Sequence, residues 1–303
     1  MVEIVTTQAR RFEDFQAALE ANDNDQILLH QPGIGTKTIT AANFKADLLA
    51  TLDELQTTVN MLTFPGAGPH NSIFRGKNMG DHVTPEQWAA IADGSFAGLY
   101  IGDYWVIGGI TWRIAAFDYY MGYGNVFGER VAVHHVVVVP DTTLYNAQMN
   151  ATAVSTGGYV GSLMYTTNLE QAKTTINAAF SGHLLVHRQY LINAVTGGRP
   201  SGGGWFDSEV ELMNEIMVYG SGIFSPVSDG TTVPSNYTIN TSQLPLFGAR
   251  NDLIRPQDDP WQQYWLRDVV SGANFAAMAN SGSATQIAAS NSLGVRPAFS
   301  IVA

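Results

Sequence analysis

The sequence predicts an α+β fold, in which a twisted antiparallel sheet is flanked by a few helices and long loops and is preceded by a small N-terminal module. Short apolar segments with alternating or β-branched residues recur along the chain, bounded by Gly, Pro, Asn and Ser. A few other segments carry apolar residues at the helical spacings of three and four. Stretches dense in Gly, Ser, Pro and Thr separate them, which is typical of long loops on a sheet scaffold.

The composition limits the function classes. With 303 residues, 45% of them hydrophobic and 14% charged, the chain is long enough for one large core and a smaller module. A net charge of -11 without any run of Lys or Arg argues against nucleic-acid partners and against adsorption to anionic membranes. The absence of cysteine removes disulfides, thiolate nucleophiles and cysteine metal sites. We expect no cofactor and no bound metal.

The first fifteen residues contain Arg10 and Arg11, but no apolar stretch follows them, so we expect no signal peptide. No apolar run approaches the roughly 20 residues that cross a bilayer. The protein is therefore expected to be made in the cytoplasm without export.

Residues 1–64 are predicted to form the N-terminal module. Residues 9–21 have the pattern of a short helix, and strands at 27–30 and 37–39 flank a turn with Pro32 and Gly33. Thr40 is predicted to be the N-cap of a longer helix that ends near residue 62.

This longer helix carries an apolar seam close to the heptad pattern. One interpretation is an amphipathic helix that packs on its own domain; the one we favour is self-association, most simply as a trimer. The seam consists of Phe44, Leu48, Leu52, Leu55, Val59 and Leu62.

A linker at residues 65–70, rich in Pro and Gly, is predicted to separate the module from an outer domain at 71–303. In this domain we predict helices at 84–92, with Thr84 and Gln87 as a capping box, and at 168–180. Strands are predicted at 104–107, 110–119 and 131–139, and loops at 196–204 and 220–242.

The last stretch, residues 261–303, contains two segments that place large apolar residues around one arginine. They are YWLRD at 264–268 and GVRPAFSI at 294–301. We predict two strands, with Trp265, Leu266, Val295 and Phe299 in one core. Arg267 and Arg296 are expected to be structural, each hydrogen-bonded to a carboxylate or to backbone carbonyls, because a buried guanidinium needs its donors satisfied.

These two segments resemble the closing sheet of C-type-lectin-like domains of the formylglycine-generating-enzyme type. Upstream segments resemble an uncharacterised domain of virion proteins from phages and prophages of Gram-positive bacteria, and the resemblance covers about residues 69–303. These segments are YIGDYW (100–105), WRIA (112–115), HHVVVVPD (134–141) and VELM (210–213).

The resemblance implies a fold and not a reaction, because the scaffold carries enzymes, lectins and receptor binders alike. The oxidase chemistry of the formylglycine-generating enzymes depends on cysteines, which this chain lacks. For a phage component, the missing signal peptide implies release by lysis within an assembled particle.

Two histidine pairs are candidate metal ligands. His134 and His135 are neighbours in a predicted strand and would point to opposite faces, so we expect structural roles. His183 and His187 have the spacing of a helical zinc site, but Leu184, Leu185 and Val186 between them favour a strand.

Two acidic groups are candidates for acid/base or calcium chemistry. Asp207, Glu209 and Glu211 alternate and would share one face of a strand; the other reading is a solvated cluster. Asp252, Asp258 and Asp259 lie in a polar loop but lack the ligand spacing of a calcium-binding loop.

A ligand site is expected by resemblance in the loops before the terminal Arg-containing strand, at about residues 280–291. The short polar side chains there suit adaptable hydrogen bonding; the alternative is an ordinary surface loop. Aromatic anchors would come from Tyr120, Tyr123 and Trp205 if their loops converge there. The polar candidates are Asn280, Ser281, Ser283, Thr285, Gln286, Ser290 and Asn291.

The expected function is that of a non-enzymatic virion structural protein, a decoration or fibre at the head or tail. We expect a homo-oligomer that docks on other virion proteins through its N-terminal module and adheres to a host surface glycan or protein. The alternatives are a cell-wall or carbohydrate-directed hydrolase that uses Asp207, Glu209 or Glu211, and a bacterial adhesin or lectin.

Overall fold

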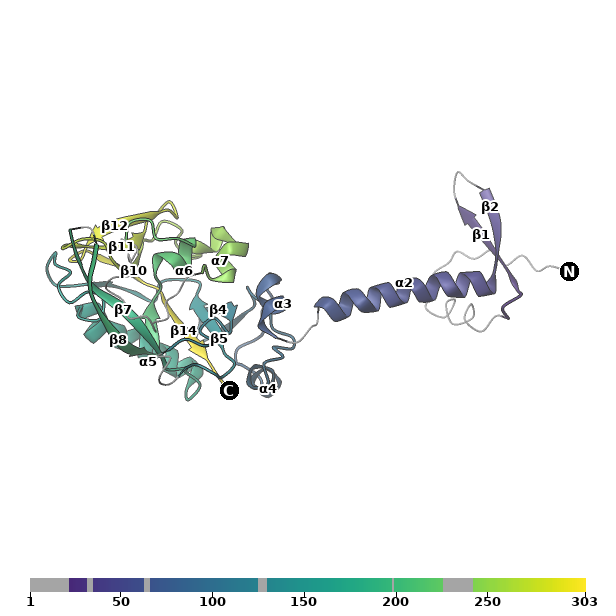
Figure 1. The fold of residues 1–303 in the computed structure, drawn as a ribbon, viewed down its shortest axis with the longest axis horizontal. Coiled ribbons are helices and arrows are strands. Elements are labelled where there is room, and N and C mark those ends of the chain that lie inside the picture. Colours follow the sequence, from purple (N-terminus) through teal and green to yellow (C-terminus); the bar gives the residue numbers. More distant parts are fainter. Residues whose placement is uncertain (1–21, 32–34, 63–65, 125–129, 198, 226–241) are drawn as a thin grey trace. The chain divides into compact units, whose positions relative to one another are not determined.

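The computed structural model describes residues 22–31, 35–62, 66–124, 130–197, 199–225 and 242–303 (Figure 1). The chain divides into two units, Met1–Phe64 and Pro65–Ala303, which are described separately below. The architecture is mixed α+β with mostly antiparallel strand pairs and few helices, so the predicted fold class is confirmed at this level.

In the first unit, strands β1 (Gln26–Gln31) and β2 (Gly35–Thr40) pair in antiparallel fashion, with Ile27 opposite Ile39. The predicted strands at 27–30 and 37–39 lie within them, whereas residues 32–34 of the turn and the predicted helix at 9–21 lie outside the described residues.

Helix α2 (Ala41–Leu62) begins where the hairpin ends, because the Thr40 side chain caps it by accepting a hydrogen bond from the backbone N–H of Asn43 at 3.3 Å. Leu52 and Leu55 of the predicted seam are 48% and 58% exposed. Leu49, which the seam did not include, is 57% exposed. Phe44 and Leu48 are half-buried, and the side chains of Val59 and Leu62 lie outside those described.

The central sheet of the second unit is buried on both faces. Val136 and Val138 enter one hydrophobic cluster, and Val137 and Val139 enter another, as expected for a run of four valines in a strand. The sheet is antiparallel throughout, in the order β3 (Tyr104–Ile107), β4 (Ile110–Phe117), β5 (Val136–Pro140), β14 (Pro297–Ile301), β9 (Val210–Leu212).

Gly108 and Gly109 join β3 to β4 with φ of 62° and 79°. Both values lie in the left-handed region that a tight hairpin turn of this kind requires, as the glycine pair predicted.

A second five-stranded sheet contains the predicted Trp-Leu-Arg strand. Its strand β10 pairs in parallel with β13, where Tyr264 lies opposite Gly294, and the other pairs are antiparallel. The single predicted sheet is thus two sheets in this structure. The order is β12 (Ala284–Ala288), β11 (Asn274–Met278), β10 (Tyr264–Val269), β13 (Ser292–Val295), β6 (Tyr145–Gln148).

The terminal segment 294–301 belongs to both sheets, because β13 ends at Val295 and β14 begins at Pro297. Trp265, Val295 and Phe299 share one core, as predicted. Leu266 lies in the second cluster instead, since neighbouring strand residues point to opposite faces.

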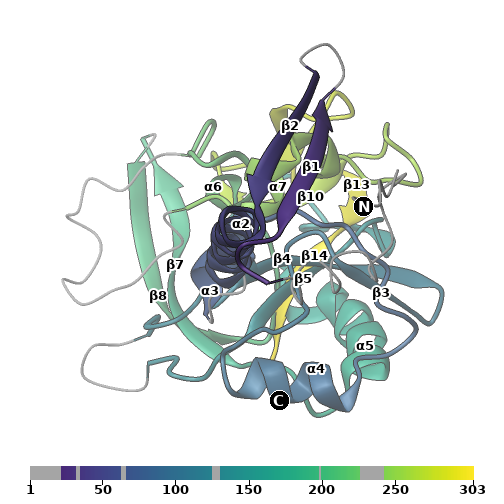
Figure 2. The same cartoon turned by 90° about the vertical axis from the view of Figure 1, so that its right-hand side faces the viewer.

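Helices cover both faces of the central sheet (Figure 2). α5 packs Leu169, Ala172, Ile176 and Phe180 into the first cluster, and α6 and α7 contribute to the second. The Thr84 side chain and the Gln87 side chain form the predicted capping box at the start of α4. The helices are α3 (Ala67–Ser72), α4 (Pro85–Ala92), α5 (Leu169–Phe180), α6 (Glu215–Tyr219) and α7 (Pro245–Ala249), with a π-helical turn at Met164–Asn168 and a 3-10 turn at Asn251–Ile254.

Several predicted boundaries are wrong. Residues 67–70, predicted as part of a linker, belong to helix α3 (Ala67–Ser72). The strand predicted at 110–119 ends at Phe117. Residues 196–204, predicted as a loop, form part of a long hairpin of β7 (His187–Thr196) and β8 (Arg199–Ser208), because pairing across the hairpin satisfies the backbone of the glycine-rich strand. The strand predicted from residue 131 begins at Val136. Of the predicted loop at 220–242, residues 226–241 lie outside the described part.

Candidate functional site

The second unit contains a buried ionic cluster around Glu211 of β9, which is 1% exposed. Arg267 of β10 and Gln189 of β7 both donate hydrogen bonds to Glu211 Oε2, and the Tyr120 hydroxyl donates to Oε1 at 2.8 Å. Arg267 also donates to Gln189 Oε1 at 3.2 Å. The Nε2 atom of His187 lies 3.5 Å from Glu211 Oε1. Four side chains from three other segments thus converge on one carboxylate.

The surroundings hold Glu211 in its ionised form. Burial by itself would raise the pKa of Glu211, but Arg267, His187 and Tyr120 outweigh burial and lower this pKa to about 2. Burial and the adjacent carboxylate raise the pKa of Tyr120 well above its usual value. A carboxylate with so low a pKa is a poor proton donor or acceptor near neutral pH, so the cluster stabilises the fold.

The lowered pKa of Glu211 predicts that the stability of the fold depends on pH. Because the folded pKa of about 2 lies below the ordinary value of 4.5, the unfolded chain binds more protons between these values. The stabilisation is therefore complete above about pH 4.5 and is lost as the pH falls towards 2. Relative to Glu211→Gln, the wild type should be more stable by about 3 kcal/mol at pH 6, and this margin should shrink by about 2 kcal/mol at pH 3. Urea unfolding of both proteins at several pH values measures this difference in the free energy of unfolding. A difference that stays constant with pH would contradict the lowered pKa of Glu211.

The predicted acidic triplet does not assemble. Asp207 is exposed and paired with Arg188 at 2.7 Å, whereas Glu211 is buried beside Arg267. Glu209 lies in the break between β8 and β9, so the expectation that all three share one strand face is wrong.

The first histidine pair shares one partner, and the second pair separates. His134 and His135 precede β5, and both contact Asp118: the ring Nδ1 of His134 lies 2.8 Å from its carboxylate, and the backbone N–H of His135 donates to it at 3.0 Å. The two histidines were predicted to lie in a strand and to point to opposite faces, but they lie before β5 and share Asp118 as a partner. His183 stacks on Trp88, whereas His187 stacks on Tyr120 in the ionic cluster.

The polar loop with the three aspartates has no convergent oxygen set. Arg250 forms a bidentate pair with Asp252, at 2.8 and 2.6 Å. Asp258 and Asp259 accept hydrogen bonds from backbone N–H groups of their own turn. Within the described ranges, no group of three His, Asp or Glu side chains is placed to hold a metal ion.

Arg296 lies at the crossing between the two sheets and is wholly buried. Its guanidinium donates to the backbone carbonyls of Pro140 at 2.8 Å and Ile254 at 2.7 Å, and to that of Leu253 at 3.1 Å. Burial and carbonyl partners agree with the predicted structural role, and Arg267 likewise has its predicted carboxylate.

Glu215 was not predicted from the sequence. Its carboxylate accepts hydrogen bonds from the backbone N–H groups of Ile223, Phe224 and Ser225, and so fixes the start of a loop. Asp268 accepts from the backbone N–H of Glu215, and burial together with the nearby Glu215 charge raises the pKa of Asp268 to about 6.

The predicted ligand span at 280–291, expected to consist of loops, contains the edge strand β12 between a turn before it and a turn after it. The Ser281 and Ser283 hydroxyls hydrogen-bond to each other at 2.7 Å, and Gln286 accepts from Asn274 at 3.2 Å. Thr285 and Ser290 are half-buried. The exposed members are Asn280, Ser281, Ser283, Gln286 and Asn291.

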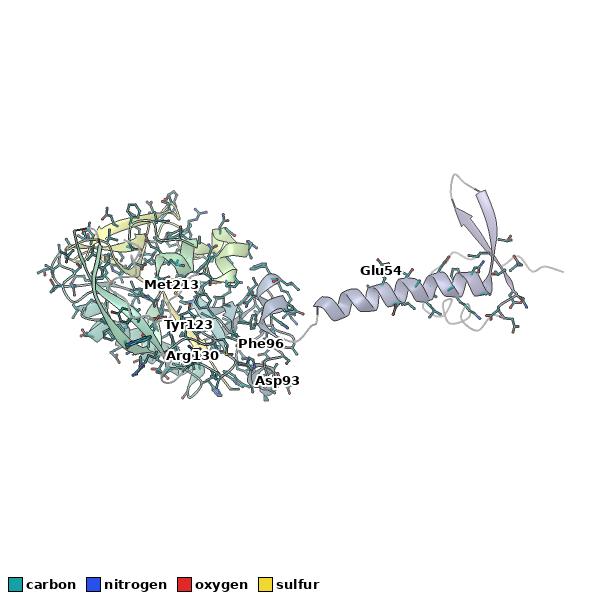
Figure 3. All side chains as sticks on the ribbon, in the orientation of Figure 1. Glu54, Asp93, Phe96, Tyr123, Arg130 and Met213 are labelled. Atoms are coloured by element: carbon teal, nitrogen blue, oxygen red, sulfur yellow. The ribbon has the colours of Figure 1, made fainter. Side chains whose placement is uncertain are left out.

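The three predicted aromatic anchors are not all exposed to a ligand. Tyr120 is 1% exposed, so its assignment as an anchor is wrong; its hydroxyl serves Glu211. Tyr123 (Figure 3) is half-buried and packs edge-on against Tyr120. Trp205 is half-buried on β8 beside Tyr190, with ring centroids 5.6 Å apart.

The structure instead exposes Trp261, which the sequence reasoning did not select. It is 70% exposed, the largest fraction among the large apolar side chains of the described ranges. Gln262 and Gln263 separate it from β10. Tyr264 of β10 lies opposite Met278 of β11, which lies opposite Ala284 of β12. The Trp261 turn and the turn at 279–283 therefore lie at the same end of the sheet. The only signal in the sequence is the Asp-Asp-Pro-Trp pattern of a turn.

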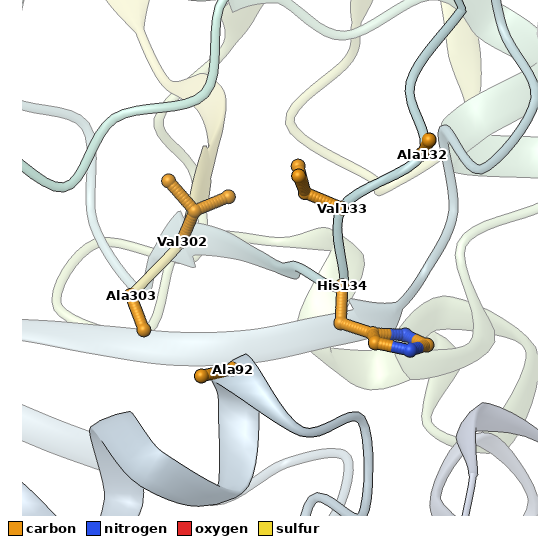
Figure 4. A pocket seen from close by; sticks show the side chains of 6 residues that line it. All are labelled: Ala92, Ala132, Val133, His134, Val302 and Ala303. Atoms are coloured by element: carbon orange, nitrogen blue, oxygen red, sulfur yellow. The ribbon is translucent and has the colours of Figure 1, made fainter.

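A pocket of about 300 Å³ lies elsewhere, and mostly methyl groups line it (Figure 4). Its one polar ring, His134, is already bonded to Asp118. The lining residues are Ala92, Ala132, Val133, His134, Val302 and Ala303.

The chain matches no protein-family model, no curated protein and no solved structure. None of the helices in the described ranges has the length and apolarity needed to cross a membrane.

Proposed function

We propose that the chain is a structural protein of a phage virion. Its N-terminal module joins copies into a homo-oligomer, most simply a trimer, and docks on other virion proteins. The second unit is an outer domain with a C-type-lectin-like fold, a decoration or fibre at the head or tail that adheres to a host surface glycan or protein. The observation that carries the proposal is the exposed leucine stripe of α2, in a unit separate from the large core.

The leucine stripe consists of the exposed Leu52 and Leu55, the half-buried Leu48 and the exposed Leu49 beside them. Its exposed part needs a partner. Burying one leucine side chain stabilises a protein by about 1.5–3 kcal/mol, and an isolated helix of this length is marginal in water. The seam has only spacings of three and four, which suits packing against the same face of other copies of α2. Because the stripe can pack against itself, further copies of α2 are the partners that would best cover it.

The outer-domain proposal is supported by the resemblance of residues 69–303 to virion domains and by the position of the terminal segment across two sheets. The hydrolase alternative gains no support from the geometry, because Asp207 and Glu211 have different partners and different exposure.

Assembly is testable with Leu52→Asp and Leu55→Asp, alone and together. Light scattering at micromolar concentration should give three times the chain mass of 32.7 kDa for the wild type, and the double variant should be a monomer, because buried carboxylates in the seam would be unpaired. Ala50→Asp is the matched control: it is an exposed position on the opposite face of α2 and should leave the oligomer intact. A wild-type monomer, unchanged by these substitutions, would rule out the seam.

The virion assignment is testable on native particles. Cryo-EM and mass spectrometry of particles purified from a lysogen that carries the gene should find the chain at the head or tail. Its absence from particles, together with its presence on the bacterial surface, would favour the bacterial adhesin instead.

A further inference from the structure

We propose that Trp261 is the stacking platform of a glycan-binding site at the end of the second sheet, specific for neutral or amino-bearing pyranose sugars. The polar groups of the site are Asp258, Asp259 and the turn at 279–283. This inference rests on the adhesive part of the proposed function and names its ligand class.

Trp261 does not contribute to the hydrophobic core, so packing does not explain the residue. Its near neighbours Tyr264 and Trp265 are wholly buried, as are Trp105 and Trp112, whereas Trp261 is 70% exposed. A large aromatic ring left in water is a common anchor in binding sites, where its burial contributes most of the affinity.

The backbone around Trp261 is held in place. The Trp261 N–H donates to the Asp259 carboxylate at 3.0 Å, and the Gln262 N–H donates to the Asp259 carbonyl at 3.0 Å. Gln262 Nε2 donates to Asn146 Oδ1 at 3.1 Å, which ties the turn to β6. A turn whose backbone is already ordered loses little backbone entropy when a ligand binds.

Two further segments lie beside this turn. The Gly294 N–H donates to the Gln263 carbonyl at 2.9 Å, so the turn leads directly into the sheet. Arg255, at the start of the same loop, packs on Gly282: a Cβ there would lie 3.2 Å from Arg255 Cγ. The exposed Asn280, Ser281 and Ser283 therefore lie beside the loop that carries Trp261.

This combination of groups fits a sugar. The face of the indole is electron-rich and attracts the weakly positive axial C–H groups of a pyranose ring. Carboxylate, amide and hydroxyl groups accept and donate hydrogen bonds to the ring hydroxyls around it. A protein partner would instead be expected to meet a wider apolar centre. The turn that carries Trp261 contains the polar residues Asp258, Asp259 and Gln262.

Charge selects among sugars. Asp258 and Asp259 are both exposed beside Trp261, whereas Arg255 is half-buried, and the whole chain has a net charge of -11. Sialylated or phosphorylated glycans would be repelled, so neutral and amino sugars are favoured.

The test uses the fluorescently labelled full chain on a printed array of neutral, amino-sugar, sialylated and phosphorylated oligosaccharides, including N-acetylchitotetraose and its deacetylated form. The wild type should bind one or more neutral or amino-sugar glycans. Trp261→Ala should weaken this binding at least tenfold, and Trp261→Phe should retain part of it. Phe224→Ala, which removes an aromatic ring that is 39% exposed and lies outside the proposed site, is the matched control and should bind as the wild type does. Thermal unfolding of Trp261→Ala should be unchanged, because the side chain is exposed.

The inference is overturned if the wild type binds no glycan or only anionic ones, or if Trp261→Ala binds as tightly as the wild type. Host-cell binding that protease abolishes and periodate does not would identify a protein receptor and overturn it too. These outcomes are separate from the proposed function: particles that contain Trp261→Ala and adsorb normally would leave the virion role intact. If the chain binds glycans but is absent from particles, the glycan site would stand and the virion role would be ruled out.

Discussion

Replacing Arg267 with alanine should lower the free energy of unfolding of the second unit by about 3–5 kcal/mol, because it leaves the Glu211 carboxylate buried without its cation. Glu211 is 1% exposed and its partner Arg267 is 6% exposed, so water cannot take the place of the guanidinium. Gln189 would also lose the hydrogen bond that Arg267 donates to it. The loss should appear in urea unfolding at neutral pH, followed by tryptophan fluorescence.

Arg188→Ala is the matched control for this prediction. It removes a second arginine-carboxylate pair, with Asp207, but both side chains are about half exposed. Exposed pairs contribute about 0–1 kcal/mol, so this variant should remain close to the wild type. Similar losses for the two variants would mean that the Glu211 cluster is far more hydrated than its burial indicates.

Phe299→Ala should lower the free energy of unfolding by about 3–5 kcal/mol, through lost transfer energy and the cavity that remains. Phe299 is 2% exposed on the inner strand β14, and its ring packs against Trp112 and Phe180 with centroids 5.5 and 5.3 Å away. Phe299→Leu keeps most of the volume and should cost less than half as much.

Differential scanning calorimetry of the same variants checks this expectation. Phe224→Ala provides a control for the loss of a phenyl ring at a 39% exposed position, where the change should stay within about 1 kcal/mol. If Phe299→Ala unfolds at the wild-type temperature, β14 is not the core strand that the structure places between β5 and β9.

Local signals predicted those parts of the fold that depend on nearby residues. The Thr84 capping box and the Gly108-Gly109 hairpin are fixed by contacts within four residues, and both are present. The hairpin of β7 and β8 was missed because glycine-rich β8 forms a strand only when β7 pairs with it. Strand pairing is a tertiary property, and local propensity does not report it.

The candidate sites show the same division. That Arg267 and Arg296 have structural partners followed from the cost of burying a charge, but which partners they have depends on distant strands. Tyr120 was expected to be an exposed anchor and is buried, whereas Trp261, four positions from the wholly buried Trp265, is exposed. Residue spacing alone cannot predict that a tryptophan in the turn before a strand is exposed and that one inside the strand is buried.

The crossing of the terminal segment at Arg296 has a consequence for the order of events during synthesis. β5 and β9 both pair with β14, so each keeps an open hydrogen-bonding edge until residues 297–301 have left the ribosome. The second sheet waits in the same way for β13, which joins β10 to β6. Open strand edges readily join those of other chains, so the nascent second unit is most vulnerable to aggregation while its last strands are still being made. The α2 helix emerges well before them and needs none of these strands, so the self-association that we propose for α2 could begin while the second unit is still incomplete.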